Sequence, residues 1–236
     1  MEKKFVRVKG KEYRVNKQKL FLFNKDIHDL SEIEGLGELT DLKWLLLTNN
    51  QISEIRGLEN LVNLEYLGLG NNQVSEIRGL ETLRNLKVLD LSLNPLTRLE
   101  GLDSLENLIG LYLWGTPIKR VKGLGNLVNL RNTKKKRMIG GLYLRHTLIP
   151  KPVIKALGGM SMGRARKPQR FVEHCMSPEE NVSEIENTGG ELLSSEDHIA
   201  RMKVKYKKLR KALAISSFLS LIISIIAMVL ELTILR

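Results

Sequence analysis

The chain has 236 residues, of which 42% are hydrophobic and 27% are charged. These values suit one or two modest domains and exclude wholesale disorder. A single cysteine, Cys175, excludes an internal disulfide framework and a cysteine-based zinc cluster, and with only four scattered histidines we expect neither a metal site nor a cofactor. The net charge of +12 is unevenly distributed, since residues 26–130 are acidic overall and residues 131–170 carry twelve basic and no acidic side chains.

Residues 1–19 are predicted to form a β-hairpin cap. Strands near residues 5–8 and 12–15 flank Gly10 and Lys11, a pair typical of a tight turn. We expect this hairpin to cover the first edge of the sheet that the following repeats form. The amino-terminal residues lack the apolar core of a signal peptide, so we expect no secretory leader.

A 22-residue period runs through the next part of the chain. Leucine accounts for 43 of the 236 residues, about twice its average share. Leucines and other aliphatic residues recur at the same offsets in four successive units, which begin at Leu42, Leu64, Leu86 and Leu108. This regularity predicts one structural unit repeated along a solenoid.

Each unit has a strand part and a turn part. It opens with the spacing L-x-x-L-x-L, whose period of two is typical of a short strand. Later aliphatic residues, spaced by three, favour a 3₁₀ or irregular turn on the opposite side. A side chain with both a donor and an acceptor follows each strand, where it is able to satisfy the backbone of the bend, and a glycine marks a second bend. These residues are Asn50, Asn72 and Asn94, with Thr116 in the fourth unit, and the glycines at 35, 57, 79, 101 and 123.

The motif LxxLxLxxNxI resembles the leucine-rich repeat family, in its 22-residue subclass, which includes bacterial internalins and a regulatory subunit of a eukaryotic protein phosphatase. It appears in residues 42–52, 64–74 and 86–96, and with a threonine in place of asparagine in residues 108–118. The resemblance covers residues 20–157 and implies an α/β solenoid. This is a leucine-rich repeat horseshoe, with a parallel sheet on its concave side and short 3₁₀ or irregular segments on its convex side. It also implies protein binding rather than catalysis.

Both ends of this domain depart from the period. At the amino end, Leu20 and Phe23 keep the spacing while Lys25 and His28 occupy the inward leucine and asparagine positions, as expected of a capping repeat. We therefore interpret His28 as a cap residue and not as a metal ligand. At the other end the pattern resumes nine residues late, which predicts an inserted loop at residues 133–141.

The side chains that flank the inward strand leucines are expected to point out from the concave face. Both tryptophans and three of the five tyrosines fall at such positions, and clustered exposed aromatic residues are typical of a protein interface. The structural alternative is that stacked aromatic rings simply shield the sheet. The predicted partner-binding residues are Trp44, Leu46, Tyr66, Val88, Asp90, Tyr112, Trp114, Tyr143 and Arg145.

Two segments connect the repeats to the carboxyl-terminal end. Residues 158–195 lack apolar periodicity and divide into a basic and an acidic half, so we interpret them as a flexible linker. Residues 196–211 are predicted to form a basic juxtamembrane helix. The residues expected to contact anionic lipid or another polyanion are Lys134, Lys135, Lys136 and Arg137 in the insertion, and Lys203, Lys205, Lys207, Lys208, Arg210 and Lys211 in this helix.

Residues 212–235 are predicted to form a transmembrane helix. Nineteen successive residues, 212–230, carry no charge, about the length that crosses a bilayer core. Basic residues gather before this span and only Arg236 follows it, so we expect a single-pass, tail-anchored protein whose amino terminus faces the cytoplasm. Ser216, Ser220 and Ser224 share one helix face, where they would either pack against a second copy of the span or bond back to their own helix.

These features predict a membrane-tethered scaffold or adaptor that binds another protein through the concave face, with a possible homodimer through the span. We expect no catalysis, because the chain has no glycine-rich phosphate loop and no nucleophile constellation. The alternative is a basic adaptor that binds anionic lipid or RNA through residues 131–170. No recognised nucleic-acid fold accompanies this basic segment, so sequence-specific binding of nucleic acid is not expected.

Overall fold

The computed structural model describes residues 4–120, 122–130, 140–149, 151–157, 159–161 and 164–176, together with residues 197, 199–201 and 204. The chain divides into two units, residues 1–199 and 200–236. In the second unit the described residues, Ala200, Arg201 and Val204, are helical and exposed. The first unit contains the repeats.

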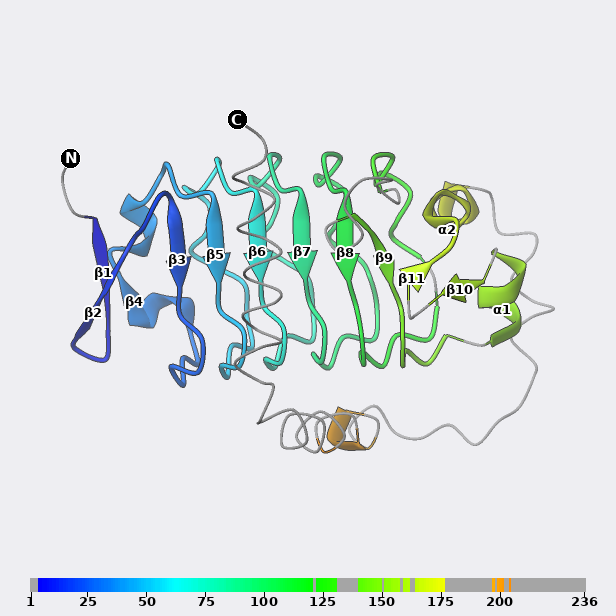
Figure 1. Cartoon of the computed structure of the whole chain (residues 1–236), viewed down its shortest axis with the longest axis horizontal. Coiled ribbons are helices and arrows are strands. Elements are labelled where there is room, and N and C mark those ends of the chain that lie inside the picture. Colours follow the sequence, from blue (N-terminus) through cyan, green and yellow to red (C-terminus); the bar gives the residue numbers. More distant parts are fainter. Residues whose placement is uncertain are drawn as a thin grey trace. The chain divides into compact units, whose positions relative to one another are not determined.

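A parallel sheet runs through the repeats (Figure 1). The central leucine of each strand pairs with its equivalent in the next repeat, in the series Leu45, Leu67, Leu89, Leu111 and Leu142. This series keeps the repeat period as far as Leu111, and the last pairing spans the predicted insertion. The sheet and its 22-residue register are therefore confirmed. The parallel strands are β3 (Lys19–Phe21), β5 (Trp44–Leu46), β6 (Tyr66–Gly68), β7 (Val88–Asp90), β8 (Gly110–Tyr112) and β9 (Gly141–Tyr143).

The opposite side of the repeats is built from tight turns. In the first full repeat Leu61 donates its backbone N–H to the carbonyl of Leu58, and Leu64 donates to Leu61, both at 2.9 Å. The same pair of bonds recurs around residues 80–86, 102–108 and 124–130. These are 3₁₀-type bonds, and the capping repeat contains two short 3₁₀ helices, η1 (Leu30–Glu32) and η2 (Leu36–Glu38). The leucines of strands and turns meet in one continuous buried core.

The buried asparagines join each repeat to the one before it. Asn72 accepts the N–H of Ile52 at 3.0 Å and donates to the carbonyls of Leu47 and Leu69 at 3.1 and 2.9 Å. Asn94 makes the corresponding bonds one repeat later, whereas Thr116 bonds only the carbonyl of Leu113 among the described residues. The predicted role of the asparagine ladder is thus confirmed, since it satisfies buried backbone groups at every bend.

A second asparagine ladder, which the sequence interpretation missed, lies on the turn side. Its side-chain amides each donate to a backbone carbonyl of the preceding repeat, at 2.8–2.9 Å. Its members were visible in the sequence, because they also recur with the period of the repeats. They are Asn63, Asn85, Asn107 and Asn129.

The amino-terminal hairpin consists of β1 (Phe5–Val8) and β2 (Lys11–Arg14), paired antiparallel. It does not extend the parallel sheet, whose edge strand is β3. Instead β1 pairs with β4 (Ile33–Glu34) and completes a separate three-stranded sheet. Val6 and Val8 point into the core, so the hairpin covers the open end of the first repeat by burying its apolar face.

The register of the capping repeat differs from our interpretation. Leu20 pairs with Leu45, three positions further along the chain than the repeat period predicts. Leu22 and Ile27 are consequently buried, while Phe23 is only half-buried and Lys25 lies beside Asn50, which accepts its N–H at 2.8 Å. The assignment of Phe23, Lys25 and His28 to the inward positions was therefore wrong.

The physical reason is an insertion inside the capping repeat. Ile27 is the buried equivalent of Ile52, and Gly35 is the equivalent of Gly57, with which it shares a positive φ of 83° and 81°. The segment from Ile27 to Gly35 holds three extra residues compared with the segment from Ile52 to Gly57, and η1 forms within it. Because aliphatic residues flank the insertion on both sides, a fixed repeat spacing selected the wrong set of side chains.

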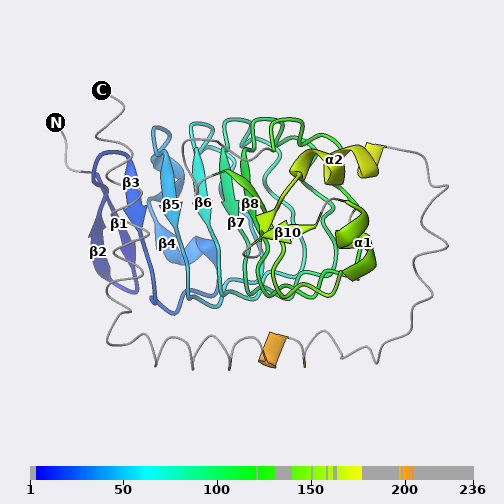
Figure 2. The same ribbon diagram turned by 45° about the vertical axis from the view of Figure 1, so that its right-hand side comes forward.

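Residues beyond the last repeat close the carboxyl end of the solenoid (Figure 2). They form α1 (Lys151–Ala156), the antiparallel strands β10 (Met160–Ser161) and β11 (Arg164–Ala165), and α2 (Pro168–Met176). Ala165, Phe171 and Val172 are buried against the core. The prediction of a flexible linker from residue 158 is therefore wrong for residues 160–161 and 164–176, because an exposed last repeat requires an apolar cover.

Two other predicted segments lie largely or wholly outside the described residues. Of the insertion, only Gly140 and Gly141 are described, and Gly141 belongs to β9, so the insertion ends earlier than predicted. Residues 205–236, with the predicted span and its serines, are not among the described ones. Within the described part of the chain, no helix is both long enough and apolar enough to cross a bilayer.

Candidate functional site

The strand register places the predicted binding residues on one surface, which we call the sheet face. Leu45, Leu67 and Leu89 point inward, so the residues on either side of each point outward. Cross-strand pairing arranges these outward positions in two rows. The first row is Lys19, Trp44, Tyr66, Val88, Gly110 and Gly141, and the second is Phe21, Leu46, Gly68, Asp90, Tyr112 and Tyr143.

The aromatic side chains of the sheet face form two separate stacks. Trp44 and Tyr66 stack with ring centroids 5.3 Å apart at an interplanar angle of 21°. Tyr112 and Tyr143 stack at 4.2 Å and 6°. Rings at these distances attract each other beyond their burial alone. The face is thus not a continuous aromatic stripe, since the two stacks lie on different strands and in different rows.

A basic side chain covers the outer ring of each stack. The Nζ of Lys19 lies 4.2 Å from the ring centroid of Trp44, and the guanidinium carbon of Arg164 lies 5.6 Å from that of Tyr143. Both are cation–π contacts. The sequence interpretation missed Lys19 because of the register error, and it missed Arg164 because that residue was assigned to the linker. Lys19 was detectable, since it precedes Leu20 as Trp44 precedes Leu45.

The remaining predicted residues vary in exposure. Leu46 and Val88 are buried, Trp114 is half-buried with its ring 6.2 Å from that of His146, and Arg145 is exposed. The cross-strand pairing therefore places seven of the nine predicted residues in the two rows of one face, while Trp114 and Arg145 lie just beyond the ends of β8 and β9. Leu46 and Val88 lie at the base of this face, so the aromatic rings are the more accessible apolar groups. A role of these residues in binding stays a prediction.

Asp90 lies between the two stacks. It is half-buried, and its Oδ1 accepts the backbone N–H of Ser92 at 2.9 Å. Burial raises the pKa of the Asp90 carboxyl above its ordinary value, although hydrogen bonds from Ser92 oppose this. Burial also raises the pKa of Tyr66 and Tyr112, and the charge of Asp90 adds to the shift of both phenols. The centre of the face is thus a desolvated acidic spot bordered by two tyrosines.

Glycines make room for this carboxylate and for the Tyr66 ring. A Cβ on Gly70 would lie 3.2 Å from Oδ2 of Asp90, and a Cβ on Gly68 would lie 3.3 Å from the Tyr66 ring. Both distances are tighter than ordinary van der Waals contact, so larger residues would displace the carboxylate and the ring. Gly68 and Gly110 also present no side chain beside Asp90 and Val88 in the two rows.

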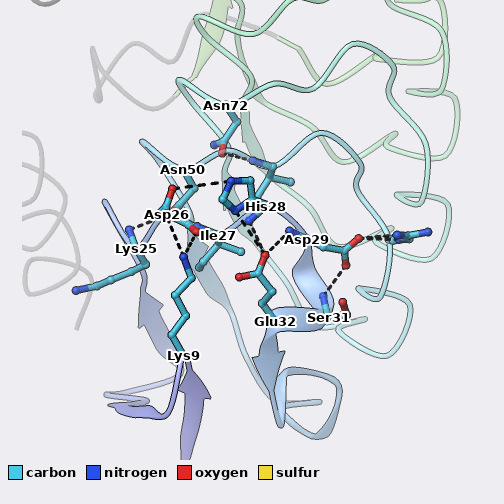
Figure 3. Close-up of polar contacts among 12 residues, drawn as sticks. Lys9, Lys25, Asp26, Ile27, His28, Asp29, Ser31, Glu32, Asn50 and Asn72 are labelled. Carbon is cyan, nitrogen blue, oxygen red and sulfur yellow. Dashed lines mark hydrogen bonds and ion pairs between the residues drawn. The ribbon is translucent and has the colours of Figure 1, made fainter.

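A polar cluster stabilises the amino-terminal cap (Figure 3). Asp29 caps η1 by accepting the N–H of Ser31 at 2.8 Å, and Glu32 accepts the N–H groups of His28 and Asp29. Arg56 holds Asp29 at 2.5 Å and lowers the pKa of that carboxyl to about 2. These contacts hold the backbone of the cap in place. Among the residues that the structure describes, no group of histidine, cysteine or acidic side chains is arranged to hold a metal ion.

Comparisons with known proteins identify the repeats. A family model described as leucine rich repeats, in two copies, matches residues 40–82 and again residues 62–104. Over residues 40–104 the chain is therefore similar to the leucine-rich repeat family. Strands β5, β6 and β7 and the Trp44–Tyr66 stack lie within these residues, and β8 and β9 continue their register. Leucine-rich repeats of other proteins stack into extended concave surfaces that bind proteins.

Solved structures of two bacterial proteins are also similar to the chain. An internalin (inlF) from Listeria monocytogenes is 35% identical over 48% of this chain and 33% of its own, with a TM-score of 0.44. Internalin C2 from the same organism is 38% identical over 47% of this chain and 48% of its own, with a TM-score of 0.43. The matched region thus spans between a third and a half of these internalins. No curated protein matches the chain.

Proposed function

We propose that this protein is a membrane-tethered adaptor that binds a partner protein on the sheet face. The observation that supports partner binding is the pair of aromatic stacks, which stand on the outer side of a sheet whose core is already filled by leucines. Partly exposed tryptophan and tyrosine rings contribute most to protein binding energy when a partner covers them. The alternative is that the rings only shield the sheet, which requires no partner. The following experiment distinguishes the two.

The test compares two double variants of the full-length protein in a crosslinked pulldown from cells. Trp44→Ala with Tyr66→Ala removes one stack and is expected to abolish partner capture while leaving the circular dichroism spectrum unchanged. Val62→Ala with Val128→Ala removes two valines outside the sheet face, 44% and 54% exposed, and is the matched control. Capture that survives loss of the stack but not loss of the valines would move the interface away from the sheet face.

Membrane tethering rests on the uncharged residues 212–230 and on the basic residues that precede them. The full-length protein is expected to stay with membranes after carbonate extraction, and a chain lacking residues 212–235 is expected to be released. Protease protection of sealed vesicles tests the orientation, since the repeats should be digested from the cytoplasmic side. Release of the full-length protein by carbonate would contradict the span.

A second candidate function is binding of a polyanion, anionic lipid or RNA, by residues 131–170. The observation in its favour is twelve basic and no acidic residues in that segment, among which Arg145, Arg166 and Arg170 are exposed. Salt distinguishes the two functions, because phosphate contacts weaken steeply as salt rises whereas an aromatic interface persists. Replacing residues 134–137 by alanine is expected to remove RNA or lipid binding without affecting partner capture. We expect no catalytic activity.

A further inference from the structure

The centre of the sheet face combines a carboxylate, two tyrosines and glycines at outward positions. Asp90 on β7 pairs with Gly68 on β6 and with Tyr112 on β8. Tyr66 approaches Asp90 closely enough for the carboxylate to raise the pKa of its phenol. Glycine occupies positions 68, 70 and 110, and the Tyr66 ring lies over Gly68 while the Asp90 carboxylate lies over Gly70. We call this region the Asp90 recess.

The carboxylate of this recess lacks a cationic partner among the described residues. The ion pairs among the described residues all involve acidic residues other than Asp90. The hydrogen bonds that the described residues donate to the Asp90 carboxylate come from Ser92. In contrast, the outer ring of each stack already carries a cation, Lys19 at one end and Arg164 at the other. A charge that is partly buried without a partner is costly, and such groups mark binding sites.

We propose that the Asp90 recess receives an arginine or lysine side chain of the partner protein, an inference that rests on the proposed binding at the sheet face. The cation would pair with the Asp90 carboxylate and lie against the Tyr66 and Tyr112 rings. Charge complementarity favours this occupant, because a half-buried carboxylate beside aromatic rings attracts a cation and disfavours an apolar or acidic side chain. The Lys19–Trp44 contact shows that the rings of this face already hold an ammonium group.

The direct test uses a small probe on the full-length protein in detergent micelles. N-acetyl-arginine N-methylamide is titrated into ¹⁵N-labelled protein, and N-acetyl-citrulline N-methylamide serves as its neutral isostere. The arginine probe is expected to shift the backbone amide signals of Gly68, Asp90 and Tyr112 saturably, and the citrulline probe is not. Equal shifts with both probes, or arginine-induced shifts confined to other acidic residues, would overturn the proposal.

Two variants define the role of the carboxylate. Asp90→Asn keeps the shape and the acceptor for Ser92, and it is expected to weaken arginine binding by about tenfold, the scale of one desolvated cation contact. Asp103→Asn removes a charge from an exposed carboxyl on the turn side and is expected to bind as the parent does. Unchanged affinity of Asp90→Asn would overturn the proposal.

Partner capture separates this inference from the proposed function. If the Trp44→Ala and Tyr66→Ala variant loses capture while Asp90→Asn retains it, the sheet face binds its partner without the recess, and only the inference fails. If neither variant loses capture, the proposed function itself fails, and the arginine titration still reports on the recess. Loss of capture in both, with normal capture by Asp103→Asn, supports both.

Discussion

Asn72 and Ile52 are joined across two repeats, since the side-chain oxygen of Asn72 accepts the backbone N–H of Ile52 at 3.0 Å. The amide of the same asparagine bonds the carbonyls of Leu47 and Leu69. One fully buried side chain therefore bonds backbone groups of two repeats, and the neighbouring Asn50 and Asn94 donate a second bond to the carbonyls of Leu47 and Leu69. The leucines of the strands and turns supply most of the buried apolar surface. The asparagine allows the bend between strand and turn to be buried as well, because it bonds the backbone polar groups there.

Asn72→Ala is expected to lower the free energy of unfolding by about 2 kcal/mol, because it leaves the buried N–H of Ile52 without a partner and removes one of the two asparagine bonds to the carbonyls of Leu47 and Leu69. Asn85→Ala is the matched control. It removes a single exposed bond to the carbonyl of Val62 and is expected to cost about 1 kcal/mol. Urea unfolding followed by circular dichroism measures both. Equal losses would show that the buried ladder has no special weight.

Gly79 and Gly57 occupy equivalent positions with nearly equal φ angles, 76° and 81°, but their surroundings differ. A Cβ on Gly79 would overlap the carbonyl oxygen of Ile55, whereas nothing lies within 4 Å of a Cβ on Gly57. Gly57→Ala should therefore cost only the strain of a left-handed backbone, about 1–2 kcal/mol. Gly79→Ala should cost clearly more, because the backbone of two repeats must separate. Thermal unfolding of the two variants makes the comparison, and a smaller loss at Gly79 would contradict it.

The sequence was sufficient to predict the repeats, the parallel sheet and the outward positions on β5, β6, β7, β8 and β9. Periodicity carries this information, because each 22-residue unit packs in the same way as its neighbours. Periodicity did not predict the two ends of the repeat domain, where the chain caps the solenoid instead of adding another repeat. Three extra residues between Ile27 and Gly35 shifted the register of the capping repeat, and the helix that buries Phe171 was assigned to a linker.

The positions of the two aromatic stacks and Asp90 relative to one another could not be predicted from the sequence either. Spacing places Trp44, Tyr66 and Tyr112 on one face but does not say which rings touch. That depends on the cross-strand rows, in which Trp44 lies opposite Tyr66 while Tyr112 lies opposite Tyr143. Asp90 was included in the predicted site, yet only the rows reveal that it separates the stacks and that glycines surround it.

Asp29 gives the cap a pH-dependent contribution to stability. The bond from Arg56, together with that from Ser31, holds the pKa of Asp29 at about 2, below its ordinary 3.8. The unfolded chain therefore binds the proton more readily, and the contribution is fully present above about pH 4 and is lost as the pH falls through about 2. Asp29→Ala is expected to lose about 1 kcal/mol at pH 7, the usual value of a helix cap, and to converge with the parent at low pH.

Asp29→Asn separates the two roles of this side chain. Asparagine caps a helix as well as aspartate does, but it cannot form the ion pair with Arg56. This variant should therefore retain most of the stability at pH 7 and show a weaker dependence on pH than the parent. Urea unfolding at several pH values between 2 and 7 measures the differences, and a pH dependence identical to that of the parent would assign it to other carboxylates.

The contribution of Asp90 to stability depends on pH in the opposite direction to that of Asp29. Burial raises the pKa of its carboxyl above the ordinary 3.8, so the folded protein binds the proton more tightly than the unfolded chain. The ionised carboxylate thus costs stability, and the cost grows as the pH rises from about 3.8 through the folded pKa. Asp90→Asn is expected to raise the melting temperature at pH 7, and this gain is expected to vanish below about pH 3.8. Asp103→Asn, at an exposed position, is expected to leave the melting temperature at pH 7 unchanged.

The combination of this gain with the loss of arginine binding is the informative result. A residue that lowers the stability of the free protein and raises its affinity for a cation is one whose charge is compensated only in the complex. Differential scanning calorimetry of the parent, Asp90→Asn and Asp103→Asn, with and without the arginine probe, measures both effects. A lower melting temperature for Asp90→Asn at pH 7 would instead make the carboxylate a structural acceptor for Ser92.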